Sequence, residues 1–179
     1  MFPTYADTYS LNLSAEEKSE GWQFISLPIL PHDESIEEVL KYIEGSYDKV
    51  MHYDSTDGRW ETTVVNRTEH YNDFTEINHT MGFWVHMTSE DTLVIGGNKP
   101  VSTDIVLQPG WNMVGYASAT DRLANDTLPS EVTKIGVFNA SREYNIEYIY
   151  DLTTYTMTAG EGYWVYNDAN YDAVWTVEY

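Results

Sequence analysis

Two stretches decide the fold of this chain: Gly21-Trp22-Gln23-Phe24-Ile25-Ser26 and Gly110-Trp111-Asn112-Met113-Val114-Gly115. They are two versions of one sequence block. Two further blocks follow in the same order in each half, residues 50–54 matching 135–139 and Gly82-Phe83-Trp84-Val85-His86 matching Gly162-Tyr163-Trp164-Val165-Tyr166. Three ordered matches indicate an internal duplication. We therefore expect two tandem modules, residues 1–98 and 99–179, joined at a seam over residues 96–100.

Each half has the pattern of a β-rich module with one short helix inserted after its second strand. The repeated blocks are apolar on both faces, which is typical of central strands. The Asp-Gly turn at 54–58 separates two aromatic-rich runs, as in a hairpin. Predicted strands cover 10–13, 22–27, 49–53, 60–65, 82–86 and 92–95, then 103–107, 111–116, 134–138, 144–150, 162–166 and 173–177. These patterns predict a mainly β fold, two tandem small barrel-like or sandwich-like repeats. Whether the copies share one sheet stays open.

The inserted helix is better defined in the first copy. Ser35 and Glu38 have the spacing of a capping box, in which each side chain satisfies a backbone donor of the first turn. Apolar residues then recur on one face from Ile36 to Ile43. Gly45 stands where a helix would end, so the helix is expected at about 35–45. The second copy predicts only a short helix or turn near 121–127.

Composition excludes several classes of function. The chain has 179 residues, 29 acidic against 9 basic, and a formal net charge of −20. Such a field repels nucleic acids and anionic membranes. With no cysteine, the chain cannot form disulfides, thiolate nucleophiles or Cys-ligated metal sites. No apolar run reaches the roughly 20 residues of a membrane span. Residues 1–4 lack the basic start of a signal peptide, so we expect a cytosolic protein or a mature or excised fragment.

Possible modification sites are the sharpest chemical signal. The acceptor pattern Asn-x-Ser/Thr occurs five times, at Asn12, Asn66, Asn78, Asn125 and Asn139, where about two would be expected by chance. Three of these residues (Asn66, Asn125 and Asn139) fall in predicted loops, where a glycan would not disturb a core. The pattern favours glycosylation in the native host, with coincidence in a Thr-rich chain as the alternative.

The aromatic residues fall into two groups. Trp22, Trp84, Trp111 and Trp164 recur at equivalent positions within apolar strands, which favours core packing over a binding role. Candidates for stacking on a ligand such as a sugar lie nearer polar turns, where rings are exposed. These candidates are Trp60, Tyr144, Tyr148 and Tyr171.

The sequence indicates neither a catalytic centre nor a defined metal site. A nucleophile elbow, a phosphate loop and a dinucleotide fingerprint are all missing from the sequence. The five histidines (His32, His52, His70, His79 and His86) lack zinc-protease spacing. Residues 54–58 lack the ligand spacing of a calcium loop, although abundant carboxylates leave calcium possible without an identifiable ligand set. We expect no enzyme and no required cofactor, while a hydrolase with paired carboxylates stays an alternative.

The repeated blocks also resemble a known family. Gly21-Trp22-Gln23-Phe24-Ile25-Ser26-Leu27-Pro28 with the later Gly82-Phe83-Trp84-Val85, and their second-copy counterparts, resemble tandem "GWNLVSLP…GYWV" repeats of archaeal secreted and cell-surface proteins associated with surface layers. Gln23 and Phe24 replace the usual Asn-Leu pair. The resemblance implies an extracellular structural or adhesion module that contacts other cell-envelope proteins or glycans. The alternative is a carbohydrate-binding module of a larger secreted protein.

Overall fold

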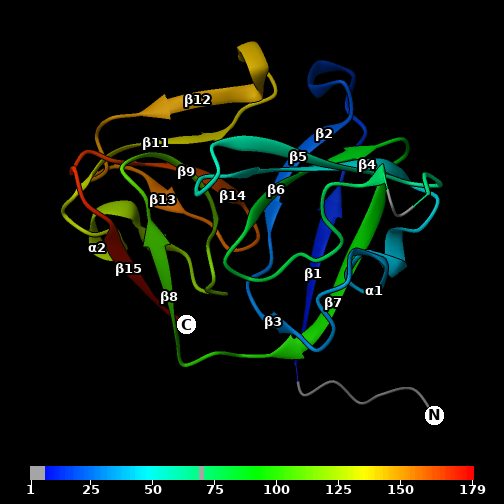
Figure 1. Ribbon diagram of the computed structural model, residues 1–179, viewed down its shortest axis with the longest axis horizontal. Helices are drawn as coiled ribbons and strands as arrows, with labels where there is room; N and C mark the ends of the chain where they lie inside the picture. Colours follow the sequence, from blue (N-terminus) through cyan, green and yellow to red (C-terminus); the bar gives the residue numbers. More distant parts are fainter. Residues whose placement is uncertain (1–6, 69–70) are drawn as a thin grey trace.

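Two β-sandwiches lie side by side in the computed structural model, which describes residues 7–68 and 71–179 (Figure 1). In the first copy, a four-stranded sheet packs on a three-stranded one. The first sheet has the order β2 (Trp22–Ser26), β6 (Gly82–Met87), β4 (Tyr47–Asp54), β5 (Arg59–Val64), and the second has the order β1 (Asp7–Leu13), β7 (Asp91–Asn98), β3 (Leu30–Pro31). All of these pairs are antiparallel.

The second copy repeats this arrangement with fewer strands. Its four-stranded sheet has the order β12 (Ile146–Ile149), β11 (Val132–Phe138), β14 (Gly162–Asn167), β9 (Gly110–Gly115), and it packs on the pair β8 (Ser102–Leu107) and β15 (Ala173–Glu178). A small ladder joins β10 (Arg122–Leu123) to β13 (Thr156–Met157). The predicted mainly β class is confirmed, and no sheet of the described residues closes into a barrel.

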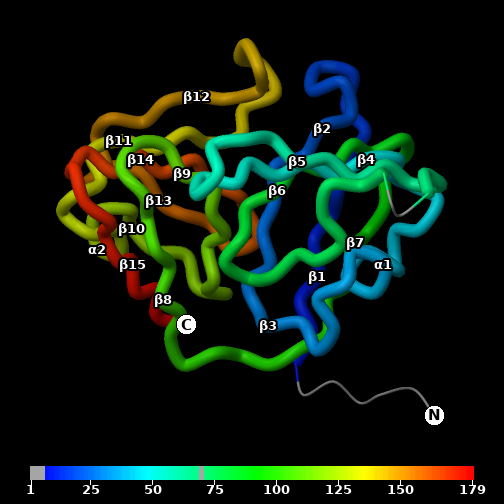
Figure 2. The backbone as a smooth tube through the Cα atoms, in the orientation of Figure 1, coloured from blue at the N-terminus to red at the C-terminus, as the bar shows by residue number. Residues whose placement is uncertain are grey.

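Each named sheet takes its strands from one half of the chain only. The link between copies runs between the end of β7 at Asn98 and the start of β8 at Ser102, along the bottom of Figure 2. The expected seam at 96–100 was therefore too long, because Gly96 and Gly97 belong to β7 and pair with Thr8 and Asp7. Residues 1–4 and His70, considered above, lie outside the described residues.

The inserted helix is shorter than predicted. Helix α1 spans Ile36–Val39, and a 3-10 turn follows at Lys41–Ile43. The predicted capping box is wrong, because Ser35 makes no side-chain cap. Its amide instead donates to Asp33 Oδ1 at 2.9 Å, and Glu38 pairs with Lys41 at 2.9 Å. The second copy has the expected single turn, α2 (Ala124–Thr127).

The predicted strand at 144–150 also begins later than expected. Glu143–Asn145 forms a 3-10 turn, and β12 starts at Ile146. The cause is local backbone geometry, because Tyr144 and Asn145 have φ of 55° and 57°, a left-handed conformation that a strand cannot contain.

Each sandwich has its own apolar core. Strands β8 and β15 alternate strictly between buried and exposed residues, so one face of that sheet is buried and the other is in solvent. The first core lies between the sheets and beneath α1, and the second has the same place in its copy. The largest fully buried side chains of these cores include Phe83, Leu27, Trp175, Tyr116 and Tyr163.

The two copies contact each other through the outer faces of their four-stranded sheets, and the contacts come in matched pairs. Isolated bridges join Ile25 to Glu161 and Met81 to Val114. The Ser26 amide donates to Gly160 O at 2.9 Å, as Gly115 donates to Thr80 O at 2.8 Å. In the alignment of the two repeats, Ser26 corresponds to Gly115 and Gly160 corresponds to Thr80. Each contact that the first copy makes with the second is therefore matched by the equivalent contact that the second copy makes with the first. The copies therefore pack with approximate two-fold symmetry, like an isologous dimer within one chain.

Glycines at equivalent positions of the two copies allow this approach. A Cβ atom on Gly82 would collide with the carbonyl oxygen of Val114, and one on Gly162 would lie 2.8 Å from Ile25 O and against the Phe24 ring. Gly82 and Gly162 are equivalent positions of the two copies. Because the obstruction includes backbone as well as a ring, small side-chain shifts cannot relieve it.

Gly82→Ala and Gly162→Ala should each destabilise the protein by about 1–3 kcal/mol, because each overpacks the contact between copies. Urea unfolding measures the loss. Thr88→Ala, at an exposed bend, is the control and should change stability by less than about 0.5 kcal/mol. Unchanged midpoints for both glycine variants would contradict the close packing of the copies.

Acid should weaken the fold through His52. Burial lowers the pKa of this histidine below 6.5, and its Nδ1 lies 2.8 Å from Gly82 O. The unfolded chain then binds more protons than the native one, so stability falls as pH drops below about 6.5. The variant His52→Gln keeps an amide donor and should show a smaller loss in urea midpoint between neutral and mildly acid pH. An equal loss in both proteins would refute the assignment.

Candidate functional site

An open groove of about 1140 Å³ lies where the two four-stranded sheets meet. Its rims are the 3-10 turns Glu17–Ser19 and Glu143–Asn145, which stand at the top of Figure 1 in blue and yellow. The residues that line it come from both copies: Lys18, Glu20, Trp22, Met51, Trp60, Trp84, Arg142, Glu143, Tyr144, Asn145, Ile146, Tyr148 and Trp164. The groove therefore exists only because the two copies pack together.

The floor of the groove is a layer of rings between the copies. Strand alternation points Val85 into the first core and its neighbour Trp84 to the opposite face. The Trp84 side chain is 8% exposed. Its ring stacks on the Phe24 ring with 4.6 Å between the ring centres, and its centre lies 6.0 Å from that of Phe138 in the other copy. The equivalent of the Trp84–Phe138 contact is formed by Trp164 and Tyr53, whose ring centres lie 5.3 Å apart. Rings from both copies therefore form this floor together.

Three rings on the walls have faces open to solvent. The exposed fractions are 47% for Trp60, 54% for Tyr148 and 85% for Tyr144. Trp60 contacts Trp164 at 5.8 Å. Tyr148 contacts Trp111 at 5.4 Å. Rings held in this way offer broad apolar faces at little cost in side-chain entropy.

The rims of the groove hold strained backbone. Of the four described non-glycine residues with positive φ, three line the groove: Glu20, Tyr144 and Asn145. A left-handed conformation is rare for a bulky residue such as tyrosine, and such strain concentrates at functional sites. The rims also touch, since Asn145 Nδ2 donates to Ser19 O at 3.3 Å. Contacts of this kind fix the two turns on either side of the rings.

Charges at the groove are balanced. Its lining holds two cations, Lys18 and Arg142, and two carboxylates, Glu20 and Glu143. Arg142 already pairs with Glu147 at 2.8 Å. Hydrogen bonds from Arg142 and Asn139 lower the pKa of Glu147 and keep it ionised. The site thus combines aromatic faces with polar groups, and its lining holds as many cationic as anionic side chains.

The structure brings together three of the four stacking candidates. Trp60, Tyr144 and Tyr148 line one groove, although they come from different copies. Tyr171 lies apart from it, where its hydroxyl donates to Glu131 Oε1 at 3.2 Å. Because Tyr171 is exposed but lies outside the groove, it can serve as a control for the three rings that line the groove.

The assignment of the four repeated tryptophans to the core is confirmed for Trp84, which is buried with Phe24 and Met113 in a third apolar cluster, and needs correction for the other three, which are half-buried. None belongs to the core of either sandwich. Trp84 is buried between the copies, Trp22 and Trp164 are half-buried beside it, and Trp111 lies half-buried against Tyr148. Sequence reasoning missed the roles of Trp22, Trp84 and Trp164 in the groove. The signal was present in the alternation, which sets these rings opposite the core residues of the same strands.

The five glycosylation candidates differ in accessibility. Asn12, Asn66 and Asn125 are exposed, whereas Asn78 and Asn139 are half-buried. Asn78 Oδ1 accepts from the amide and hydroxyl of Thr80. The Nδ2 atom of Asn139, where a glycan would attach, donates to Glu147 at 2.8 Å.

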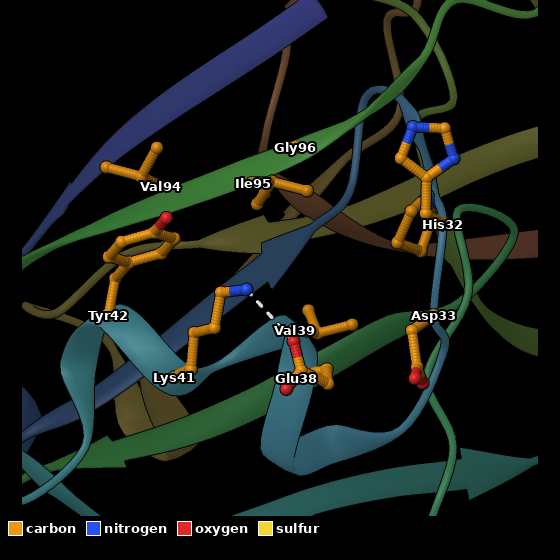
Figure 3. Close-up of a pocket in the computed structure, with 10 residues that line it drawn as sticks. His32, Asp33, Glu38, Val39, Lys41, Tyr42, Val94, Ile95 and Gly96 are labelled. Atoms are coloured by element: carbon orange, nitrogen blue, oxygen red, sulfur yellow. Dashed lines mark hydrogen bonds and ion pairs between the residues drawn. The ribbon is translucent and has the colours of Figure 1, made fainter. Parts of the chain in front are cut away.

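A second pocket lies between α1 and β7, and Figure 3 shows Lys41 and Glu38 paired within it. Its volume of about 40 Å³ suits little more than one or two waters. Elsewhere in the described residues, no group of three or more His, Asp or Glu side chains is placed to hold a metal ion. Nor does the described part contain a helix long and apolar enough to cross a membrane.

We compared the chain with known protein families, curated proteins and solved structures. No protein-family model, curated protein or solved structure matches the chain.

Proposed function

We propose that this protein is a non-catalytic module of an archaeal cell surface, and that the groove between its copies binds carbohydrate. The observation that carries the proposal is the meeting of Trp60, Tyr144 and Tyr148 in one open groove. Sugars present apolar C–H faces, which stack on aromatic rings, and hydroxyl groups, which hydrogen-bond to polar side chains. The groove offers both kinds of partner.

The size and shape of the groove favour an oligosaccharide over a single sugar. Its volume of about 1140 Å³ exceeds the usual range of pockets for drug-sized molecules. It is open, and its exposed rings stand on walls from both copies. A chain of several sugars could therefore contact Trp60 on one wall and Tyr148 on the other.

Two carboxyls near the groove have shifted pKa values, and neither suits a general acid acting in the groove. A glycosidase needs a carboxyl whose pKa is raised so that it can donate a proton. Beside the groove, Glu147 has a lowered pKa and is ionised. Burial does raise the pKa of Glu161, but this residue accepts a hydrogen bond from Tyr163 and does not line the groove.

The setting on a cell surface is supported by the resemblance to archaeal surface repeats and by the sequons. Three sequon asparagines are exposed, and the strongly acidic surface suits a solvated exterior. Envelope proteins or glycans are the proposed partners.

Trp60→Ala should lower the affinity for a bound polysaccharide by about tenfold, because it removes one stacking face. Affinity electrophoresis against a panel of soluble polysaccharides identifies a ligand, and calorimetry measures the affinities. Tyr148→Ala should have a similar effect. The matched control is Tyr171→Ala, which removes an exposed ring outside the groove and should bind like the unmodified protein. Equal losses at Tyr171 and Trp60 would rule out the groove as the site.

In the native host, glycans should occupy Asn12, Asn66 and Asn125 before Asn139, whose Nδ2 is engaged by Glu147. Glycopeptide mass spectrometry of protein from that host measures the occupancy of each site. Five unmodified sequons would count against the cell-surface setting.

A further inference from the structure

We infer that the groove selects uncharged glycans and discriminates against acidic ones. This inference rests on the proposed function and narrows its ligand class. It follows from two features together, the balance of charges within the groove and the field of the whole chain.

Within the groove, an anionic sugar would find little to bind. A carboxylate or sulfate is recognised best by a free arginine fork. Arg142 is already paired with Glu147 at 2.8 Å. An acidic glycan would therefore have to displace this carboxylate from the Arg142 guanidinium.

The other cations near these rings, Lys49 and Lys134, form cation–π contacts with aromatic side chains. Lys49 lies 5.8 Å from the centre of the Trp22 ring. Its second-copy equivalent, Lys134, lies 5.3 Å from Trp111 and 4.2 Å from Tyr166. Cations held in this way gain stability from the ring. Of the two lining cations, Lys18 is then the one that forms no ion pair among the described residues, and Glu20 and Glu143 line the same groove.

The field outside the groove acts in the same direction. The chain carries a formal net charge of −20, so polyanions are repelled before they reach the site. An uncharged glycan meets no such barrier. It can use the exposed rings for stacking and groups such as Asn145 for hydrogen bonds.

The test compares neutral polysaccharides (β-glucan, mannan, xylan) with acidic ones (polygalacturonate, alginate, hyaluronan) by affinity electrophoresis and calorimetry. We expect binding to one or more neutral members only. The affinity should change less than about twofold between about 0.01 M and about 1 M NaCl, because salt screens only interactions between charges. Trp60→Ala should weaken this binding, and Tyr171→Ala should not.

A charge-reversal variant tests whether the charges of the groove lining are what prevents acidic polysaccharides from binding. Glu20→Lys/Glu143→Lys gives the groove a net positive lining and should gain binding to acidic polysaccharides at low salt, and this gain should disappear at about 1 M NaCl because salt screens the attraction. Acidic polysaccharides that bind the unmodified protein and depend on Trp60 would overturn the selectivity but leave the carbohydrate function standing. If no polysaccharide of either class binds, the proposed function itself fails.

Discussion

The close approach of two backbones at Gly82 and Gly162 is the constraint on which the rest of the structure depends. At each glycine a backbone carbonyl of the other copy occupies the space of a side chain. Without that approach, the paired bridges between the copies could not form. The outer faces of the two sheets would then remain exposed, with their rings in water, and no groove would lie between them.

This contact also explains why the repeated tryptophans are so prominent. A β-sandwich needs one apolar face per sheet, yet the four-stranded sheets here are apolar on both. One face closes the core of its own copy, and the other packs against the second copy, as Trp84 does against Phe138. The same chain thus has the packing of a domain core and of a dimer interface. The groove lies where this interface opens.

The copies differ where the proposed binding occurs. Tyr53 pairs with Trp60 across one hairpin, and the equivalent residue Phe138 pairs with Ile146. Likewise, Thr62 of the first copy corresponds to Tyr148 of the second, each opposite the equivalent residues Met51 and Gly136. The shared residues build the interface, and the divergent ones supply the exposed rings. Such a division lets a ligand site develop without disturbing the packing of the copies.

The sequence by itself determined the duplication, the mainly β class and most of the strands, because these follow from short-range alternation and turn chemistry. It also selected Trp60, Tyr144 and Tyr148 as exposed rings. Only the tertiary structure decided that these rings share one groove, because residues distant in the chain meet there through packing between copies. It also decided that Trp84 faces the other copy and that Ser35 makes no cap. Local pattern cannot show which of two apolar faces a neighbour will cover.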